Sequence, residues 1–310
     1  MEHNKHKLKQ LVVLSGKGGT GKTSISASLI HLAGQSPHHP VFADADVDAA
    51  NLALVTEATP NQSHPFQGSF LAEINPELCE NCGMCAGVCR YNAVLLPTNN
   101  HPWHRVNELL CEGCASCVHA CPETAIQLHQ QQDGEWFQST TPYGQLFHAE
   151  LFPAAENSGK LVTTVKQQAK LYAEDNACDL LIVDGPPGIG CPVISASAGA
   201  DLALLVAEPG VSGIHDLERI IKTLQEFNVP ILVCINKADL YPRGAKDIRE
   251  LVAEYGFPLA GEIPFDEAIP NAIVAMQPVT RFAPDSPASV SIRQVWHTLQ
   301  QIIFDEGSDS

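Results

Sequence analysis

The chain has 310 residues, 45% of them hydrophobic, which is enough for one large domain or two modest ones with a real core. Its 35 acidic and 18 basic residues give a net charge of −17 and argue against a nucleic-acid-binding surface. No run of 18 apolar residues is present, and the basic segment 1–10 lacks the apolar stretch of a signal peptide, so we expect no membrane insertion.

A glycine-rich segment follows the first predicted strand, at 11–14, and precedes a helical pattern at 24–32. It fits the phosphate-binding pattern G-x-x-x-x-G-K-[ST], in which backbone N–H groups converge on phosphate oxygens at a helix N-terminus. We expect Lys22 to reach the β- and γ-phosphates and Thr23 to bind Mg²⁺. The predicted nucleotide-binding residues here are Gly16, Lys17, Gly18, Gly19, Thr20, Gly21, Lys22, Thr23 and Ser24.

Alternating carboxylates follow the next predicted strand, at 40–43, in the sequence Asp44-Ala-Asp-Val-Asp48. In extended geometry these side chains share one face, and one of them is suited to position an attacking water molecule. The later segment 56–66 is rich in Pro, Asn, Gln and His, and this composition predicts a loop.

Two runs of the form C-x2-C-x2-C-x3-C come next, offset by 32 residues from Cys79 to Cys111, and the second is followed by Pro122. In bacterial two-cluster ferredoxins, three cysteines of such a run hold one cubane and the fourth reaches the other. We therefore expect two [4Fe–4S] clusters. Cluster 1 is assigned to Cys79, Cys82, Cys85 and Cys121, and cluster 2 to Cys89, Cys111, Cys114 and Cys117.

Other chemistry fits these cysteines less well. A zinc ribbon needs two C-x2-C pairs rather than two runs of four. A disulfide framework is typical of secreted chains, whereas eight cluster-type cysteines out of eleven indicate a reducing cytoplasm. Of the others, Cys178 and Cys234 are expected to be buried, inert thiols because they lie in or near apolar segments.

The rest of the chain alternates strands with helices after turn signals between 133 and 151, which predict a hairpin. This alternation predicts an α/β fold with a doubly wound, mostly parallel sheet, into which the cysteine module is inserted as an α+β domain. We expect domain parts 1–68 and 133–310 around an insert at 69–132. The predicted strands are 180–183, 202–207 and 231–235, and the predicted helices are 158–173, 213–227 and 244–255.

Ligands of such a sheet lie at the carboxyl ends of its strands, where Asp184 and Asn236 fall. Asp184 has the position of a Walker-B carboxylate that holds magnesium or its water. The predicted Mg²⁺ ligands are Thr23, Asp46 and Asp184. The following segment 185–188, Gly-Pro-Pro-Gly, is suited to sensing a γ-phosphate.

With Lys17 in K-G-G-x-G-K-T, nearly the whole chain resembles the MinD/ParA/Mrp group of deviant Walker A ATPases, which includes the nitrogenase iron protein. The cysteine insert narrows this resemblance to MinD-like ATPases that contain a ferredoxin-type domain. The resemblance implies a P-loop NTPase fold and ATP as the nucleotide. It also implies a homodimer, or a heterodimer with a related ATPase, in which Lys17 reaches the partner's phosphates.

The same resemblance implies roles for further residues. Asp46 is expected to position the water in catalysis together with Lys17 and Lys22, and Asp44 is the alternative. Asn236, Pro264 and Asp266 correspond to adenine-contacting elements.

Four features depart from the family pattern or leave alternatives open. Residues 236–239 spell N-K-x-D, which reads guanine in GTPases, so GTP is the minor alternative. No C-x-x-C pair follows Cys121, unlike in Mrp-type cluster carriers. Arg90 replaces the proline that usually follows a fourth cysteine, which would place a cation beside the second cluster. The apolar face of the helical pattern at 292–303 favours core packing over membrane binding, because its flanks are acidic.

These observations predict an iron–sulfur ATPase. ATP binding, hydrolysis and dimer switching would be coupled to electron transfer or metallocofactor maturation on a partner protein. The alternative is a cluster carrier or assembly ATPase of the Mrp type, and a positioning ATPase would leave eight cysteines unexplained. Cys191 is expected to be a buried or interface thiol that ligates neither cluster.

Overall fold

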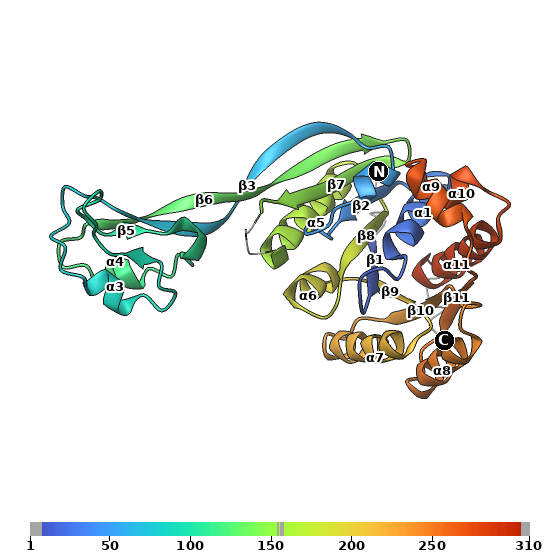
Figure 1. The fold of residues 1–310 in the computed structure, drawn as a ribbon. Helices are drawn as coiled ribbons and strands as arrows, with labels where there is room; N and C mark the ends of the chain where they lie inside the picture. The colour runs from blue at the N-terminus through green and yellow to red at the C-terminus, as the bar shows by residue number, and fades with distance from the viewer. Residues whose placement is uncertain (1–7, 154, 156–157, 305–310) are drawn as a thin grey trace. The chain divides into compact units, whose positions relative to one another are not determined.

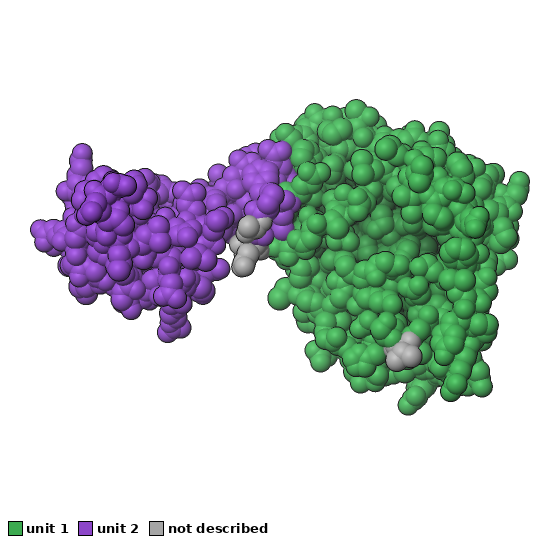
Figure 2. All heavy atoms as spheres, viewed as in Figure 1, with its two compact units in different colours: residues 1–64, 136–150, 158–310 green, residues 65–135, 151–157 purple. Residues whose placement is uncertain are grey.

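The structure is a computed structural model that describes residues 8–153, 155 and 158–304. The described residues separate into two compact units (Figure 2). The first comprises the described parts of 1–64, 136–150 and 158–310, and the second comprises 65–135 with the described parts of 151–157. The chain enters the second unit at Pro65 and returns to the first at Trp136, and the described part of 151–157 is again grouped with the second unit.

The first unit is built on a parallel sheet (Figure 1). The full strand order is β11-β10-β9-β1-β8-β2-β7-β6-β3, and the ladders from β11 to β7 are parallel. From β1 the sheet extends through β9, β10 and β11 on one side and through β8, β2 and β7 on the other, which confirms the predicted doubly wound arrangement. The strands are β1 (Lys9–Ser15), β2 (Pro40–Asp44), β3 (Thr59–Ile74), β6 (Ile126–Thr141), β7 (Gly144–Leu151), β8 (Leu180–Pro187), β9 (Leu202–Ala207), β10 (Ile231–Asn236) and β11 (Leu259–Ile263).

Helices cover both faces of this sheet because its central strands are apolar on both sides. Alternate residues such as Leu11 and Val13 pack with α1 and α11 in one core cluster. Helices α5, α6 and α7 contact strands β2, β8 and β9. The helices are α1 (Lys22–Gly34), α2 (Leu52–Val55), α5 (Ser158–Asp175), α6 (Cys191–Ser197), α7 (Val211–Glu226), α8 (Pro242–Glu254), α9 (Ala268–Val274), α10 (Val279–Phe282) and α11 (Pro287–Phe304).

The predicted loop at 56–66 is wrong, because β3 begins at Thr59. β3 is the last strand in the sheet order, and most side chains of its first half are exposed. An edge strand with two solvated faces has no apolar alternation and tolerates Pro60 and Pro65. The predicted hairpin is present: β6 and β7 are neighbours joined by two residues.

The C-terminal helix α11 is part of the core, as its apolar spacing indicates. Ile292, Val295 and Leu299 are fully buried, whereas Ile302 is exposed. Among the helices that the structure describes, none combines the length and apolar run needed to cross a bilayer.

A buried lysine joins α5 to α6. Lys166 Nζ donates hydrogen bonds of 2.8, 2.7 and 2.8 Å to the carbonyls of Ser195, Ala196 and Ala198 at the end of α6. Burial, together with Lys170, lowers the pKa of Lys166 to about 7. The last carbonyls of a helix lack partners within it, so this ammonium satisfies groups that would otherwise be unpaired.

The second unit has short elements around a small core. Ala72, Ile74, Cys85 and Ile126 are its buried members, and several other cysteines pack against them. So few aliphatic side chains make a thin core for a unit of this size. The elements between β3 and β6 are α3 (Met84–Val88), β4 (Val94–Leu95), β5 (Arg105–Val106), the 3-10 turn η1 (Glu108–Leu110) and α4 (Ser116–Ala120).

Candidate functional site

The glycine-rich loop lies between β1 and α1, as expected, and close contacts explain two of its glycines. A Cβ at Gly16 would lie 2.5 Å from the carbonyl oxygen of Asp216. Gly21 has a φ of 89°, and a Cβ there would collide with the side-chain amide of Asn236. Thr23 and Ser24 are partly exposed in the first turn of α1.

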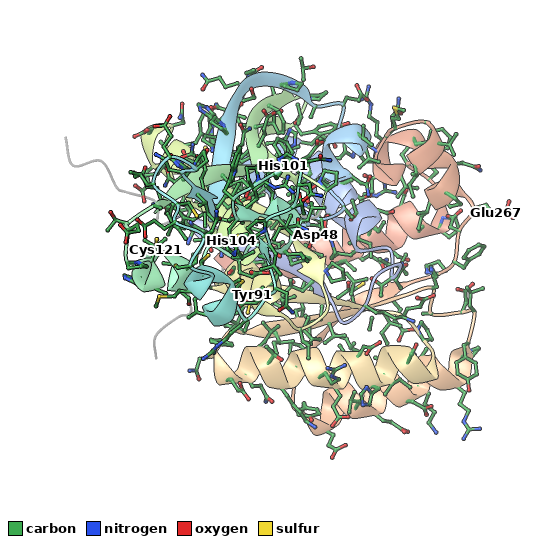
Figure 3. All side chains as sticks on the ribbon, turned by 60° about the vertical axis from the view of Figure 1, so that its left-hand side comes forward. Asp48, Tyr91, His101, His104, Cys121 and Glu267 are labelled. Atoms are coloured by element: carbon green, nitrogen blue, oxygen red, sulfur yellow. The ribbon has the colours of Figure 1, made fainter. Side chains whose placement is uncertain are left out.

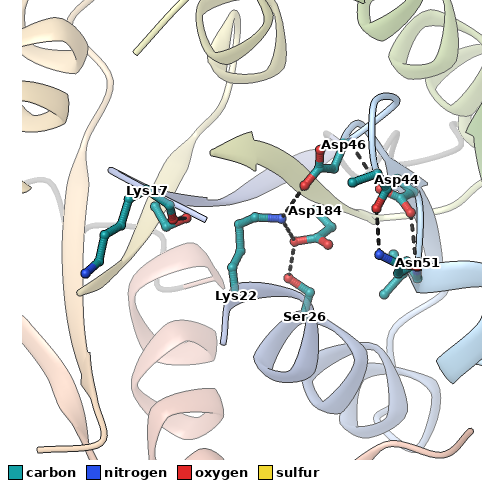
Figure 4. A network of polar contacts seen from close by, with 10 residues as sticks. Lys17, Lys22, Ser26, Asp44, Asp46, Asn51 and Asp184 are labelled. Atoms are coloured by element: carbon teal, nitrogen blue, oxygen red, sulfur yellow. Dashed lines mark hydrogen bonds and ion pairs between the residues drawn. The ribbon is translucent and has the colours of Figure 1, made fainter. Parts of the chain in front are cut away.

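A buried network of one lysine and three aspartates lies beside this loop (Figure 4). Lys22 Nζ is 2.9 Å from Asp184 Oδ1 and 3.6 Å from Asp46 Oδ2. Burial alone would lower the pKa of Lys22, but Asp184 and the other two carboxylates raise it above its ordinary value. Parallel pairing places these residues together, because β2 and β8 align Asp44 with Asp184.

Asp44 has both carboxylate oxygens engaged by backbone N–H groups. Oδ1 accepts from Asp46 N and Oδ2 from Leu52 N, each at 3.1 Å. Burial and the charge of Asp184 raise the pKa of Asp44 to about 8. The Asp46 carboxylate is less buried, and its recorded side-chain partner is Lys22. Asp46 is thus the more accessible of the two carboxylates, and Asp44 binds backbone N–H groups of segment 45–52.

The raised pKa of Asp44 predicts a pH-dependent stability. The folded protein retains a proton that the unfolded chain loses above about pH 4, so the free energy of unfolding should fall as pH rises toward about 8. We expect Asp44→Asn to remove about 1–3 kcal/mol of this loss between pH 5 and pH 8. Urea unfolding of the protein without added nucleotide, at pH 5 and at pH 8, measures this change in the free energy of unfolding. Asp48→Asn, at a neighbouring exposed carboxylate, is the control. Equal pH slopes in wild type and Asp44→Asn would contradict the assignment.

Asp184 fits the predicted magnesium role. Ser26 Oγ donates a hydrogen bond of 2.7 Å to the Oδ1 atom that also contacts Lys22. Oδ2 of the same carboxylate is buried without a hydrogen-bond partner among the described residues. An unpaired buried carboxylate oxygen is costly unless a cation or its water satisfies it. Sequence reasoning did not identify Ser26, although its position four residues after Lys22 places both on one helix face.

Lys17, the signature lysine, is held by residues near α7. Its Nζ donates to Ser212 Oγ at 3.1 Å and lies 3.8 Å from Glu208 Oε2. Glu208 also pairs with Lys237 at 3.1 Å. The Lys17 side chain is partly exposed, so it has room to leave these partners.

The three predicted adenine-contacting residues make different contacts in this structure. Asn236 is buried and donates a hydrogen bond of 2.7 Å from Nδ2 to the carbonyl of Thr20. This bond fixes the phosphate loop to the end of β10. Asp266 accepts from Ala268 N and Ala288 N at 2.9 and 3.1 Å. Pro264, half-buried, follows the end of β11.

Asp239, the last residue of the N-K-x-D pattern, contacts the segment that follows β11. Its Oδ1 accepts a hydrogen bond of 2.6 Å from Phe265 N.

The eight cysteines of the second unit line two separate hollows. We call hollow 1 the one lined by Cys79, Cys82, Cys85 and Cys121, together with His104 and Glu123. Hollow 2 is lined by Cys89, Cys111, Cys114 and Cys117, together with Tyr91 and Ala72. The hollows thus divide the cysteines between them as the predicted crossed ligation requires. Figure 3 labels Cys121, His104 and Tyr91 on this unit.

The thiols that line the hollows are not gathered around single points. Among the described residues, no group of three or more His, Cys, Asp or Glu side chains converges on one metal position. In a cubane each thiolate binds a different iron, so four cysteines surround a cage instead of meeting at a point. Backbone amides of Ala93 and Ala125 donate to Cys89 Sγ and Cys121 Sγ, both at 3.3 Å.

The remaining cysteines differ in exposure. Cys234 is fully buried in β10, and burial raises its pKa to about 12. Cys178 is half-buried and its pKa is raised, again mainly by burial. Cys191 is exposed at the start of α6, so it is not the buried thiol that was one of its expected states.

Comparison with known proteins identifies the family. Residues 11–279 match the CobQ/CobB/MinD/ParA nucleotide binding domain. The chain belongs to this family. It is 33% identical over 294 residues to MJ0578 of Methanocaldococcus jannaschii, which covers 95% of this chain and 97% of that protein.

Two further similarities bear on the site. MinD of Pyrococcus horikoshii OT3, solved with Mg-ADP, has a TM-score of 0.59 at 17% identity, covering 95% of this chain and 97% of the other. The sheet is therefore that of MinD-like P-loop NTPases. The iron–sulfur cluster carrier protein of Aquifex aeolicus is 25% identical over 137 residues, which is 40% of this chain and 38% of that protein.

Proposed function

We propose that this family member is an ATPase that holds two [4Fe–4S] clusters and couples ATP binding and hydrolysis to electron transfer or metallocofactor maturation on a partner protein. One observation carries the proposal: two hollows, each lined by four cysteines, occur in one chain with a phosphate loop and its acidic network. When bound, the clusters would supply one-electron storage, with the ligand sets that the hollows define.

The nucleotide chemistry follows from the network beside the loop. In the nucleotide-free arrangement, Lys22 is paired with Asp184 and Asp46. Triphosphate binding would draw the Lys22 ammonium onto the β- and γ-phosphates, and Mg²⁺, held by Thr23, Asp46 and Asp184, would replace its charge at the carboxylates. Asp46 would orient the attacking water.

Dimerisation would complete the site. Lys17 would exchange Ser212 and Glu208 for the phosphates of a partner subunit, either a second copy or a related ATPase. We assign the protein to the cytoplasm because thiolate clusters require a reducing compartment. Adenine recognition by Asn236, Pro264 and Asp266 remains part of the proposal and would require that they change the partners described above.

The alternative function is cluster delivery, which the partial match to an iron–sulfur cluster carrier favours. Both functions start from the same test: anaerobically reconstituted protein should contain about eight irons per chain and hydrolyse ATP. One zinc or two irons per chain would refute the cluster assignment. Incubation with an apo-ferredoxin then separates them, because a carrier loses iron to the acceptor and a redox coupler retains it.

A further inference from the structure

The two hollows of the second unit are related by an internal repeat. Every residue that lines hollow 1 has a counterpart 32 positions away that lines hollow 2, with the offset that relates Cys79 to Cys111. Glu80 corresponds in this way to Glu112, so the acidic residue after each first cysteine is matched. Two sites built on one pattern would bind equivalent clusters unless the unmatched positions differ in charge.

Charge differs at several positions of the repeat, and two of these positions directly follow the fourth cysteine of each run. After the fourth cysteine, Arg90 follows Cys89, whereas the neutral Pro122 follows Cys121. One residue further on, Tyr91 lines hollow 2 and its counterpart Glu123 lines hollow 1. Hollow 2 thus has a nearby cation and a neutral phenol, and hollow 1 has a carboxylate.

The proximity of Arg90 to hollow 2 has independent support. The Arg90 guanidinium lies within electrostatic range of the Cys114 thiol, which lines hollow 2. Cys114 is a ligand assigned to hollow 2, so a positive charge at Arg90 acts on the group that would carry negative charge there.

Histidine supplies a third, uncharged difference. His104 is buried in hollow 1, where hollow 2 has Ala72. Its Nδ1 lies 3.3 Å from Asn81 Oδ1, and the Asn81 amide is fixed by a bond of 2.8 Å from Nδ2 to the carbonyl of Pro102. At about pH 8.5, where histidine side chains carry little charge, Arg90 and Glu123 are the charge differences directly after the fourth cysteine of each run.

We propose that the two clusters are unequal electron acceptors and that the cluster in hollow 2 is reduced first, because Arg90 lies beside it and Glu123 lies beside the other. This inference rests on the proposed function, since it requires both clusters. Each reduction adds one negative charge, which a nearby cation favours and a nearby carboxylate opposes. An electron taken from a donor protein would therefore reside in hollow 2, and hollow 1 would provide the stronger reductant.

The expected size of the difference is modest because Arg90 and Glu123 are exposed. Each charge should change the reduction equilibrium constant by about two- to fivefold in low salt. Together they separate the two steps by roughly tenfold, which is about 59 mV for a one-electron couple. Salt screens exposed charges, so the separation should shrink at high ionic strength.

The test is a redox titration of the anaerobic full-length holoprotein, followed by EPR, at about pH 8.5 in low and high salt. We expect Arg90→Gln to lower the higher-potential step alone and Glu123→Gln to raise the lower-potential step alone. The double variant should bring the two steps closer together than either single variant does. Arg90→Lys keeps the charge and should titrate like wild type, and Lys246→Gln on α8 controls for loss of one positive charge elsewhere.

The outcomes separate this inference from the function on which it rests. Wild type with fewer than about eight irons would refute the two-cluster function. With full iron content, the Arg90→Gln titration decides the assignment of hollow 2 as the first acceptor. A shift in the lower-potential step, in both steps or in neither step would refute it. If Arg90→Gln itself loses iron, Glu123→Gln still decides the order, because it must raise the lower step alone.

Discussion

Replacing Lys22 with methionine is expected to weaken ATP binding by about a hundredfold or more. The Lys22 ammonium would donate charge-assisted hydrogen bonds to two phosphates, each worth about 1.5–3 kcal/mol. Methionine has a similar length and no charge, so it removes these bonds with little loss of packing. Calorimetric titration with ATP and Mg²⁺ measures the affinity.

Lys17→Met is the matched control for this prediction. The structure holds Lys17 on Ser212 and Glu208, away from the network of Lys22. Binding by the isolated chain should change by less than about threefold, whereas hydrolysis and ATP-dependent dimerisation should fall. Equal losses of ATP affinity in the two variants would refute the division of roles. Because Lys22→Met leaves buried carboxylates without their cation, Lys22→Arg and thermal unfolding serve as checks on folding.

Replacing Cys89 with serine is expected to remove about half of the bound iron, and the lost iron should come from the cluster held mainly by the second cysteine run. Cys89 belongs to the first run in sequence but lines hollow 2. Cys121→Ser should produce the opposite loss, because Cys121 lines hollow 1. Iron analysis and EPR of anaerobic protein distinguish the clusters.

Cys191→Ser controls for the removal of a thiol outside the hollows. It should retain both clusters and the full iron content, since Cys191 is exposed on α6 in the other unit. Loss of the cluster held mainly by the first run on replacing Cys89 would show that ligation is not crossed. Iron beyond two cubanes, present only in a dimer, would instead indicate a third cluster shared through Cys191.

Sequence patterns predicted those features of this protein that depend on a few consecutive residues. The phosphate loop, the acidic ends of β2 and β8 and the buried parallel strands each leave a pattern in a few consecutive residues. The edge strand β3 leaves none, because its solvated faces remove the alternation on which strand prediction depends.

The roles of single side chains were harder to predict, because they depend on residues distant in sequence. Asn236 ends a predicted strand, but its bond to Thr20 spans 216 positions. The hydrogen bonds of Ser212 with Lys17 and of Ser26 with Asp184 are similar cases. Serine is a common residue, and tertiary packing determines which group it contacts. The internal repeat was visible in the sequence, yet only the hollows show which of its positions line the same space.

The three hydrogen bonds of Lys166 have a mechanical consequence. A single buried ammonium fixes the end of α6 to the middle of α5, so neither helix can slide along the other without breaking bonds in a region closed to water. α6 begins directly after segment 185–190, which follows Asp184. Movement of segment 185–190 would therefore shift α5 and α6 together, as one stiff pair.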